Sequence, residues 1–290
     1  MSIDKFHEKI RKMKNPSVLD LSVLPQKFPP ELLQNNDKNI LTYQRFYETL
    51  LDNLKDIVPA VRFDFNSFAL MGSTGLESLE FLLTFAAGCG YYVLLDGVQT
   101  LSPQNAARSA NFLLGNSCKW YFDGLIIDAG IGSDAIRPYA AKLNETGKSL
   151  FVVARTANKS APETQDLLTG TRLAHVAKSD IINRYAEPLP GRCGYSQIGI
   201  MAGASSADSL RNLRSKFKHL FILIDGSDYP NANIKNCSFA FDPLGHGAAV
   251  CVGESITLAW QESVDGDYLT AAVAAAERLK KNIARYISVL

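Results

Sequence analysis

Acidic side chains stand at the ends of several apolar runs in this 290-residue chain. Four runs end at or beside an aspartate, namely Asp64, Asp96, Asp128 and Asp225. Asp228 and Glu254 follow two of the later runs. Carboxylates that converge raise one another's pKa unless a cation neutralises them, so the four aspartates are candidate metal ligands and the whole set could hold an amine. Each one taken singly also suits a helix cap or a strand end.

Other polar candidates follow the fifth run, where Arg155, Thr156 and Asn158 stand close together. Histidine catalysis has little support, because His246 precedes the last run and the other three histidines lie in helical or pre-strand contexts. The chain has no Gly-x-Ser-x-Gly elbow, no Gly-x-x-x-x-Gly-Lys-Ser/Thr loop, and no Gly-x-Gly-x-x-Gly fingerprint after its first run. No cofactor is therefore expected.

Eight short apolar runs predict buried parallel strands. Most are nearly continuous in apolar residues, as in YYVLLD and FILID, which is typical of strands covered on both faces. The runs are Val18–Val23, Ala60–Phe65, Tyr91–Asp96, Gly124–Ala129, Leu150–Arg155, Gln197–Ala202, Phe221–Asp225 and Gly247–Val252.

Longer amphipathic segments alternate with these runs and predict helices, at Asn39–Ile57, Thr74–Ala87, Ser102–Leu114, Ser133–Leu143, Glu163–Asn183, Ser205–Phe217 and Asp267–Val289. The alternation repeats about every 33 residues, which predicts a single (β/α)8 TIM barrel over the whole chain. Residues 1–15 are expected to form a helix outside the barrel, and residues 267–289 a closing helix. A doubly wound open sheet is the alternative.

The charge balance narrows the classes of partner. The chain has 30 Lys and Arg against 29 Asp and Glu, so no nucleic-acid partner is expected. No stretch approaches the roughly 18 apolar residues that cross a bilayer, and Met1–Lys14 is charged throughout, so no membrane partner or secretion signal is expected. The five cysteines are scattered without close spacing. These features predict a cytoplasmic protein.

Several segments, in order along the chain, resemble the bacterial type 2 orotidine 5′-phosphate decarboxylases. RTANKSAPETQDL (Arg155–Leu167) is similar to that family's Thr-Ser-Asn-Pro-Ser…Gln-Asp-Leu stretch, and VPAVRFDF (Val58–Phe65) to its second strand. YYVLLDG, GLIIDAGIGSDAIRPY and IMAGASSADSLRNLR resemble its third, fourth and sixth units. The resemblance covers nearly all of the barrel. It implies a TIM-barrel carboxy-lyase of pyrimidine biosynthesis and a homodimer with the third-strand loop at its interface.

The family's catalytic motif is incomplete in this chain. The family carries Asp-x-Lys-x-x-Asp at the end of its third strand and a further lysine on its second. Here Asp96 is kept, Val98 and Leu101 stand at the lysine and the second aspartate, and Arg62 replaces the second-strand lysine. Because no lysine occurs from residue 56 to residue 118, no shift of the alignment restores one.

The missing lysine matters because of the family's reaction. Loss of CO2 from orotidine 5′-monophosphate (OMP) leaves a carbanion-like centre, which the lysine ammonium stabilises and protonates. Val98 can do neither, and arginine is effectively never deprotonated, so Arg62 is a poor proton donor. Asp96 and Arg62 are therefore the candidate catalytic residues that the resemblance carries over.

The substrate-binding positions also differ from the family. The ribose-binding aspartate aligns with Ser22, the pyrimidine-contacting serine with Ala157, and the phosphate-gripping arginine with Glu254. The phosphate loop is replaced by a segment with Asp225 and Asp228, and these carboxylates would repel a phosphate dianion. The candidate substrate-binding residues are Ser22, Asp64, Asp128, Thr156, Asn158, Asp225, Asp228 and Glu254.

Three functions follow from these observations, and they leave open whether the chain is an enzyme. The first is a decarboxylase-like barrel that has lost the reaction, either a non-catalytic pseudoenzyme or a repurposed member with a small-molecule ligand at its carboxyl rim. The second is an active decarboxylase that converts OMP to uridine monophosphate (UMP) and CO2. The third is a metal-dependent enzyme that uses the strand-end carboxylates, since the barrel hosts many chemistries.

Overall fold

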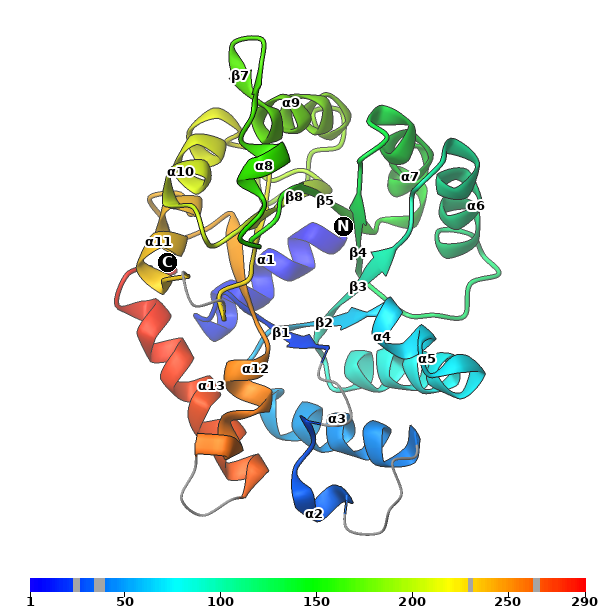
Figure 1. Cartoon of the computed structure of the whole chain (residues 1–290), viewed down its shortest axis with the longest axis vertical. Helices are drawn as coiled ribbons and strands as arrows, with labels where there is room; N and C mark the ends of the chain where they lie inside the picture. The colour runs from blue at the N-terminus through cyan, green and yellow to red at the C-terminus, as the bar shows by residue number, and fades with distance from the viewer. Residues whose placement is uncertain (23–26, 34–39, 229–231, 263–266) are drawn as a thin grey trace.

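A computed structural model describes residues 1–22, 27–33, 40–228, 232–262 and 267–290 of the chain. Eight parallel strands close into a barrel, which confirms the predicted (β/α)8 fold (Figure 1). Their order around the barrel is β1-β10-β9-β8-β5-β4-β3-β2. Their bounds are β1 Ser17–Leu21, β2 Ala60–Asp64, β3 Tyr92–Val98, β4 Gly124–Asp128, β5 Ser149–Arg155, β8 Ile198–Gly203, β9 Ile222–Asp225 and β10 Ala248–Val252.

Helices separate the strands and surround the barrel (Figure 1). Val23 and Asn39, which bound two of the predicted elements, lie outside the described residues. The helices are α1 Ser2–Met13, α2 Pro30–Leu33, α3 Ile40–Leu54, α4 Phe65–Ala69, α5 Gly72–Gly88, α6 Pro103–Leu113, α7 Ser133–Thr146, α8 Pro162–Gln165, α9 Ala174–Ala186, α10 Ala207–Lys216, α11 Ile234–Cys237, η2 Ser238–Ala240, α12 Glu254–Thr257, η3 Ala259–Glu262 and α13 Tyr268–Ala284.

Burial along the strands follows the prediction from their apolar runs. All six residues of β8 and all five of β10 are buried. Burial decreases at the carboxyl ends of β2, β4 and β9, where Asp64, Asp128 and Asp225 reach water to different degrees. Polar residues therefore gather at the end of the barrel where parallel strands feed their helices.

Several helices begin where the sequence supplies a cap. The Ser102 hydroxyl accepts a hydrogen bond from the backbone N–H of Asn105, and Pro103 occupies the first helical position of α6. The Asp267 carboxylate accepts from the backbone N–H groups of Leu269 and Thr270, which starts α13. Such caps satisfy N–H groups that the first turn leaves without partners.

Helix α1 covers the amino-terminal end of the barrel and crosses behind the strands in Figure 1. It buries Ile3, Phe6 and Ile10. The Phe6 ring stacks on Tyr92, the first residue of β3, with centroids 4.2 Å apart. The helix thus lies outside the β/α alternation and closes the end of the barrel opposite the strand-end carboxylates.

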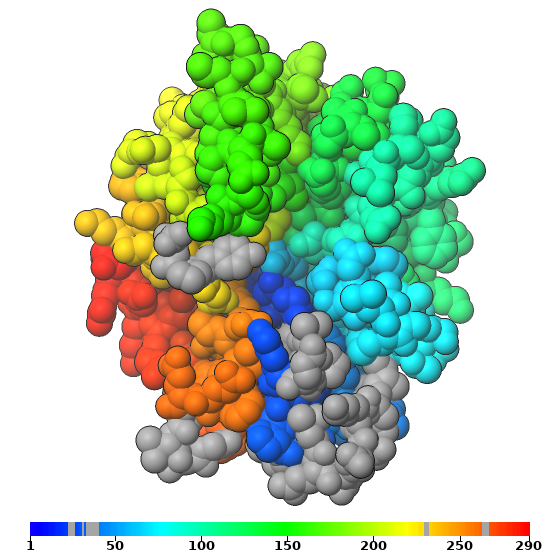
Figure 2. All heavy atoms as spheres, viewed as in Figure 1, coloured from blue at the N-terminus to red at the C-terminus, as the bar shows by residue number. Residues whose placement is uncertain are grey.

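The segment predicted as one helix, Glu163–Asn183, contains a hairpin instead. Helix α8 ends at Gln165, and two short antiparallel strands, β6 (Leu168–Thr169) and β7 (Arg172–Leu173), precede α9. Gly170 turns the chain with a positive φ of 65°, which a glycine adopts without strain. Figure 2 shows this hairpin projecting from the body of the molecule. The prediction was wrong because helical periodicity on both sides hid an eight-residue interruption, residues 166–173.

Two further elements differ from the prediction. Helix α4 follows β2 at once, because the Asp64 carboxylate accepts from the backbone N–H groups of Asn66 and Ser67 and caps it. Helix α13 ends at Ala284, five residues before the predicted Val289. None of the helices in the described ranges combines the length and hydropathy that crossing a bilayer requires.

Candidate functional site

One arginine lies among the carboxylates at the carboxyl end of the barrel. Arg62 is on β2, beside Asp20 in the register of β1 and β2. Its Nη2 donates to Oδ2 of Asp20, and its Nη1 lies 2.8 Å from Oδ1 of Asp225 and 3.7 Å from Oδ2 of Asp96. Arg62 is 8% exposed. A buried guanidinium thus joins carboxylates from three other strands.

The electrostatics of this cluster follow from burial and from the one shared cation. Burial lowers the pKa of Arg62, but the charges of Asp20 and Asp225 more than offset it, so the pKa lies well above its ordinary value. Burial raises the pKa of Asp20 despite its contact with Arg62. Burial likewise raises the pKa of Asp96 to about 6, although Arg62 and the backbone N–H of Gly97 favour its charged form. Arg62 is therefore a fixed cation.

The backbone beside Asp96 is adapted to this arrangement. Gly97 has a φ of 82° and donates its backbone N–H to Oδ1 of Asp96 at 2.6 Å. A Cβ atom at this position would lie 2.5 Å from Nδ2 of Asn66 and 2.7 Å from Oδ1 of Asp64. A glycine is required for both reasons.

The mouth of the barrel is a cavity of about 430 Å³ around this cluster. Six carboxylates line it, and among the described lining residues Arg62 is the one cation. Ser22 lines it as well. The carboxylates are Asp20, Asp64, Asp96, Asp225, Asp228 and Glu254.

Several of these carboxylates also have structural partners at the mouth. Asp228 accepts from the backbone N–H of Gly253 at 2.6 Å, and Asp64 caps α4. Glu254 pairs with Lys27 at the rim. Arg62 was already a candidate at this site through the resemblance, whereas no sequence pattern connected Lys27 to Glu254.

Asp128 does not reach the mouth. Its side chain is 61% exposed, and its Oδ1 lies 2.7 Å from Nζ of Lys178 on α9. It lines a neighbouring cavity of about 670 Å³ between the ends of β4 and β5 and helix α9. In the described part of the chain, no three His, Cys, Asp or Glu residues are placed to hold a metal ion. The metal hypothesis for Asp64, Asp96, Asp128 and Asp225 therefore gains no support from this geometry.

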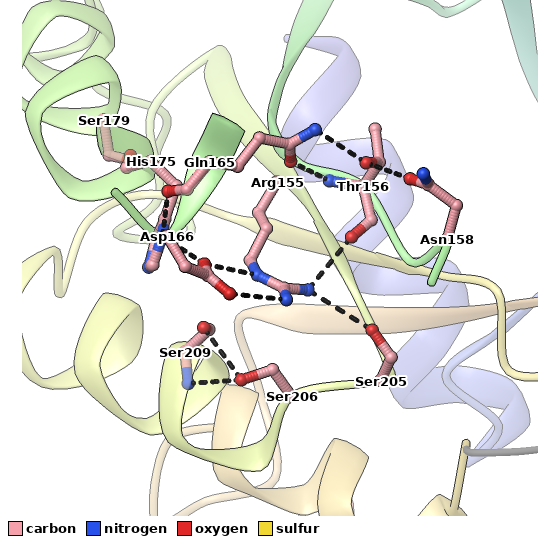
Figure 3. A network of polar contacts seen from close by, with 10 residues as sticks. All are labelled: Arg155, Thr156, Asn158, Gln165, Asp166, His175, Ser179, Ser205, Ser206 and Ser209. Atoms are coloured by element: carbon pink, nitrogen blue, oxygen red, sulfur yellow. Dashed lines mark hydrogen bonds and ion pairs between the residues drawn. The ribbon is translucent and has the colours of Figure 1, made fainter. Parts of the chain in front are cut away.

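Thr156 and Asn158 belong to a polar network beyond β5, drawn in Figure 3. The Thr156 hydroxyl donates to Oδ1 of Asn158, and Nε2 of Gln165 donates to the same hydroxyl at 2.8 Å. Oε1 of Gln165 accepts from the backbone N–H of Thr156 at 2.7 Å. These contacts fold the loop after β5 onto itself.

The same network contains a buried arginine that the sequence did not connect to its partners. Arg155 is 4% exposed and grips Asp166 with two hydrogen bonds of 2.9 Å (Figure 3). Nδ1 of His175 lies 3.1 Å from Oδ1 of Asp166. The hydrogen bond from Arg155 lowers the pKa of Asp166, outweighing burial. The sequence feature that could have predicted this network is the Gln165–Asp166 pair, which lies in the Arg155–Leu167 segment that resembles the decarboxylase family.

Neither position of the catalytic motif after Asp96 places a charge in the mouth. Val98 ends β3 and pairs in register with Ile127 of β4. Leu101 is 78% exposed. Both lie outside the residues that line the mouth.

No protein-family model matches the chain. Among curated proteins, the chain is 23% identical over 261 residues to an orotidine 5′-phosphate decarboxylase from Caldicellulosiruptor saccharolyticus, covering 88% of this chain and 85% of the relative. It is 25% identical over 276 residues to the same-named protein of Clostridium kluyveri, covering 92% and 90%.

Solved structures share the fold. The OMP decarboxylase of Plasmodium berghei superposes with a TM-score of 0.78 at 13% identity, covering 98% of this chain and 97% of that one. The OMP decarboxylase of Leishmania donovani superposes with a TM-score of 0.72 at 18% identity, covering 98% of each chain.

Proposed function

Since the chain belongs to the orotidine 5′-phosphate decarboxylase family, we propose that it keeps the family's barrel and has lost the decarboxylase reaction. One observation carries the proposal: the cation at the centre of the mouth is Arg62, held by Asp20, Asp96 and Asp225. A barrel of this kind is a pseudoenzyme toward OMP.

The reaction needs a proton at the carbon that loses CO2, and the lysine that delivers it in the family has no counterpart among the described residues lining the mouth. The pKa of Arg62 is raised well above its usual value by Asp20 and Asp225, and its Nη atoms already donate to these residues. No lysine occurs from residue 56 to residue 118. A group that stays protonated cannot act as a general acid at neutral pH.

The charges at the mouth also favour a different ligand. Six carboxylates face one arginine within the same cavity. A phosphate dianion entering it would meet net repulsion, whereas a small amine would find acceptors already in place. The proposal therefore includes a small amine-bearing molecule as the ligand of the mouth.

An active OMP decarboxylase is the second candidate. It is favoured by the shared name of the curated relatives, which match 88% to 92% of the chain in the two cases above. In its favour too, Arg62 lies between carboxylates, as the resemblance implies for the family's lysine. This candidate requires Arg62, or the carboxyl of Asp96 with its pKa raised to about 6, to deliver the proton.

A spectrophotometric assay separates the two candidates. Purified protein is incubated with OMP, and the fall in absorbance is followed for wild type and for Arg62→Ala. We expect no rate above that of buffer for either protein. A wild-type rate proportional to protein concentration and lost in Arg62→Ala would establish the active enzyme, because a contaminating host decarboxylase would survive the substitution.

Calorimetry tests the ligand part of the proposal. Wild type is titrated with UMP and with putrescine, a small diamine. We expect heat of binding for putrescine alone and its loss in Asp225→Asn, while Asp134→Asn, which alters a carboxylate on α7 away from the mouth, leaves it unchanged. Binding of UMP would refute the charge argument.

We further propose that the chain forms a homodimer through the apolar surface beside β3. Leu101 is 78% exposed and Phe112 is 52% exposed. The Trp120 ring lies 6.4 Å from Phe112 and 5.8 Å from Phe65, around a cavity of about 500 Å³. Exposed apolar side chains on such a surface are typical of protein contacts, and the family resemblance implies a dimer with the third-strand loop at its interface.

A further inference from the structure

A second polar cavity lies on the outer side of the barrel, between α13 and the loops after β9 and β10. Helices α12 and α13 run side by side at this place (Figures 1 and 2). The cavity has a volume of about 610 Å³, and we call it the α13 groove. Arg278, Lys281 and Arg285 of the α13 segment line it, with Ser227, Ser255 and Asn282. It therefore combines three cationic side chains with three neutral hydrogen-bonding ones.

The spacing of the three cations places them on one face. Positions three, four and seven apart along a helix share a side, so Arg278, Lys281 and Arg285 point the same way. With a rise of about 1.5 Å per residue, the first and last of them are about 10 Å apart along the axis. A row of this length exceeds a single phosphate group and suits a chain of two or three.

These cations also have no carboxylate partner within ion-pair distance among the residues that the structure describes. By contrast, Lys178, which lines the cavity beside β4 and β5, is paired with Asp128. Two carboxylates, Asp228 and Glu262, line the groove as well, and Asp228 is occupied by the backbone N–H of Gly253. Three cations against two carboxylates leave a net charge of +1.

We propose that the α13 groove binds a small polyphosphate anion, such as the phosphate chain of a nucleoside triphosphate. Arg278 and Arg285 grip terminal phosphates through their planar forks, and Lys281 lies between them as a point charge. Ser255 and Asn282 donate to the remaining oxygens, while the Ser227 hydroxyl already donates to the carbonyl of Cys251. A concave cavity and the balanced charge of the whole chain favour this small anion over a nucleic acid.

The proposal is independent of the decarboxylase question, since the three cations are not among the residues lining the mouth. The test is calorimetric titration of the full chain with sodium tripolyphosphate, with sodium sulfate as the comparison anion. We expect binding of tripolyphosphate that weakens as NaCl rises from about 50 to about 300 mM, because salt screens exposed charges.

Three variants make the test specific. The double change Arg278→Gln with Arg285→Gln should weaken binding at least about tenfold, because two charge-assisted grips are lost. Lys280→Gln removes the same kind of charge from the same helix outside the groove and should leave the Kd unchanged. The proposal fails if wild type gives no heat with tripolyphosphate, or if Lys280→Gln weakens binding as much as the double variant.

Discussion

Nη1 of Arg62 on β2 lies 2.8 Å from Oδ1 of Asp225 on β9, although β1 and β10 separate these two strands in the barrel. The same guanidinium reaches Asp20 on the intervening β1. Arg62 therefore ties neighbouring and non-neighbouring strands together at the mouth. Its role in stability can be measured apart from any reaction.

Replacement of Arg62 by methionine should destabilise the fold. The change leaves Asp20, Asp96 and Asp225 without their shared cation in a largely buried place, and breaking such a cluster by removing one partner costs about 3 kcal/mol or more. Urea unfolding of wild type and Arg62→Met measures the difference. Lys55→Met, which removes an exposed ion pair with Asp52, serves as the control and should leave the midpoint unchanged. Equal midpoints for all three proteins would contradict a stabilising cluster.

The pH dependence of the free energy of unfolding should report the raised pKa of Asp96. Its pKa is raised to about 6 in the folded chain, above its usual value of 3.8. Between these values the folded chain binds the proton and the unfolded chain does not, so stability falls as the pH rises through this window. Asp96→Asn removes that penalty and should be more stable than wild type above about pH 6, by on the order of 2 kcal/mol, with the difference vanishing below about pH 4.

Denaturant unfolding of both proteins from pH 4 to pH 8 measures this effect. Asp208→Asn, a change at an exposed carboxylate paired with Arg211, is the matched control and should follow wild type throughout. A constant difference between Asp96→Asn and wild type across the range would show that Asp96 does not titrate there.

Asp166 should hold the loop after β5 in place. Asp166→Asn leaves Arg155, which is 4% exposed, without its carboxylate and should lower the free energy of unfolding by on the order of 3 kcal/mol. Amide hydrogen exchange in the β6–β7 hairpin should speed up as well, since the hairpin follows Asp166 directly. Asp52→Asn, at an exposed pair with Lys55 that does not involve the hairpin, should do neither. Unchanged amide hydrogen exchange of the hairpin in Asp166→Asn would show that the Arg155–Asp166 network does not hold this loop in place.

The apolar surface beside β3 should control assembly. Light scattering of wild type should give twice the chain mass of 31.8 kDa. Leu101→Glu with Phe112→Glu should give a single chain mass with unchanged circular dichroism, because charges on both sides of a two-fold interface repel. Leu244→Glu, at an exposed leucine away from this surface, should leave the dimer intact. A wild-type protein of single chain mass would contradict the homodimer proposal.

The barrel was predictable because its strands are buried on both faces and so leave continuous apolar runs in the sequence. The candidate site was less predictable from the sequence. Arg62 was recognised as the residue in place of a lysine, but its contact with Asp20 depends on the register of β1 and β2, which local patterns do not encode. Asp128 was grouped with the other strand-end aspartates, yet Lys178, fifty residues later, holds it outside the mouth. Side-chain pairs of this kind, between residues on different strands and helices, can be identified only once the closed barrel is known.

Helix α1 links the two ends of the chain, and this has a consequence for how the protein is made. Nε of Arg11 donates to the carbonyl of Leu290, 279 residues away, and Nζ of Lys5 contacts the carboxylate of Asp123 at 2.8 Å. On a ribosome, the helix is made well before Tyr92 and Phe221, the residues on which Phe6 packs. Its apolar face therefore stays uncovered until those residues have been made, and docking of α1 becomes a late step in folding.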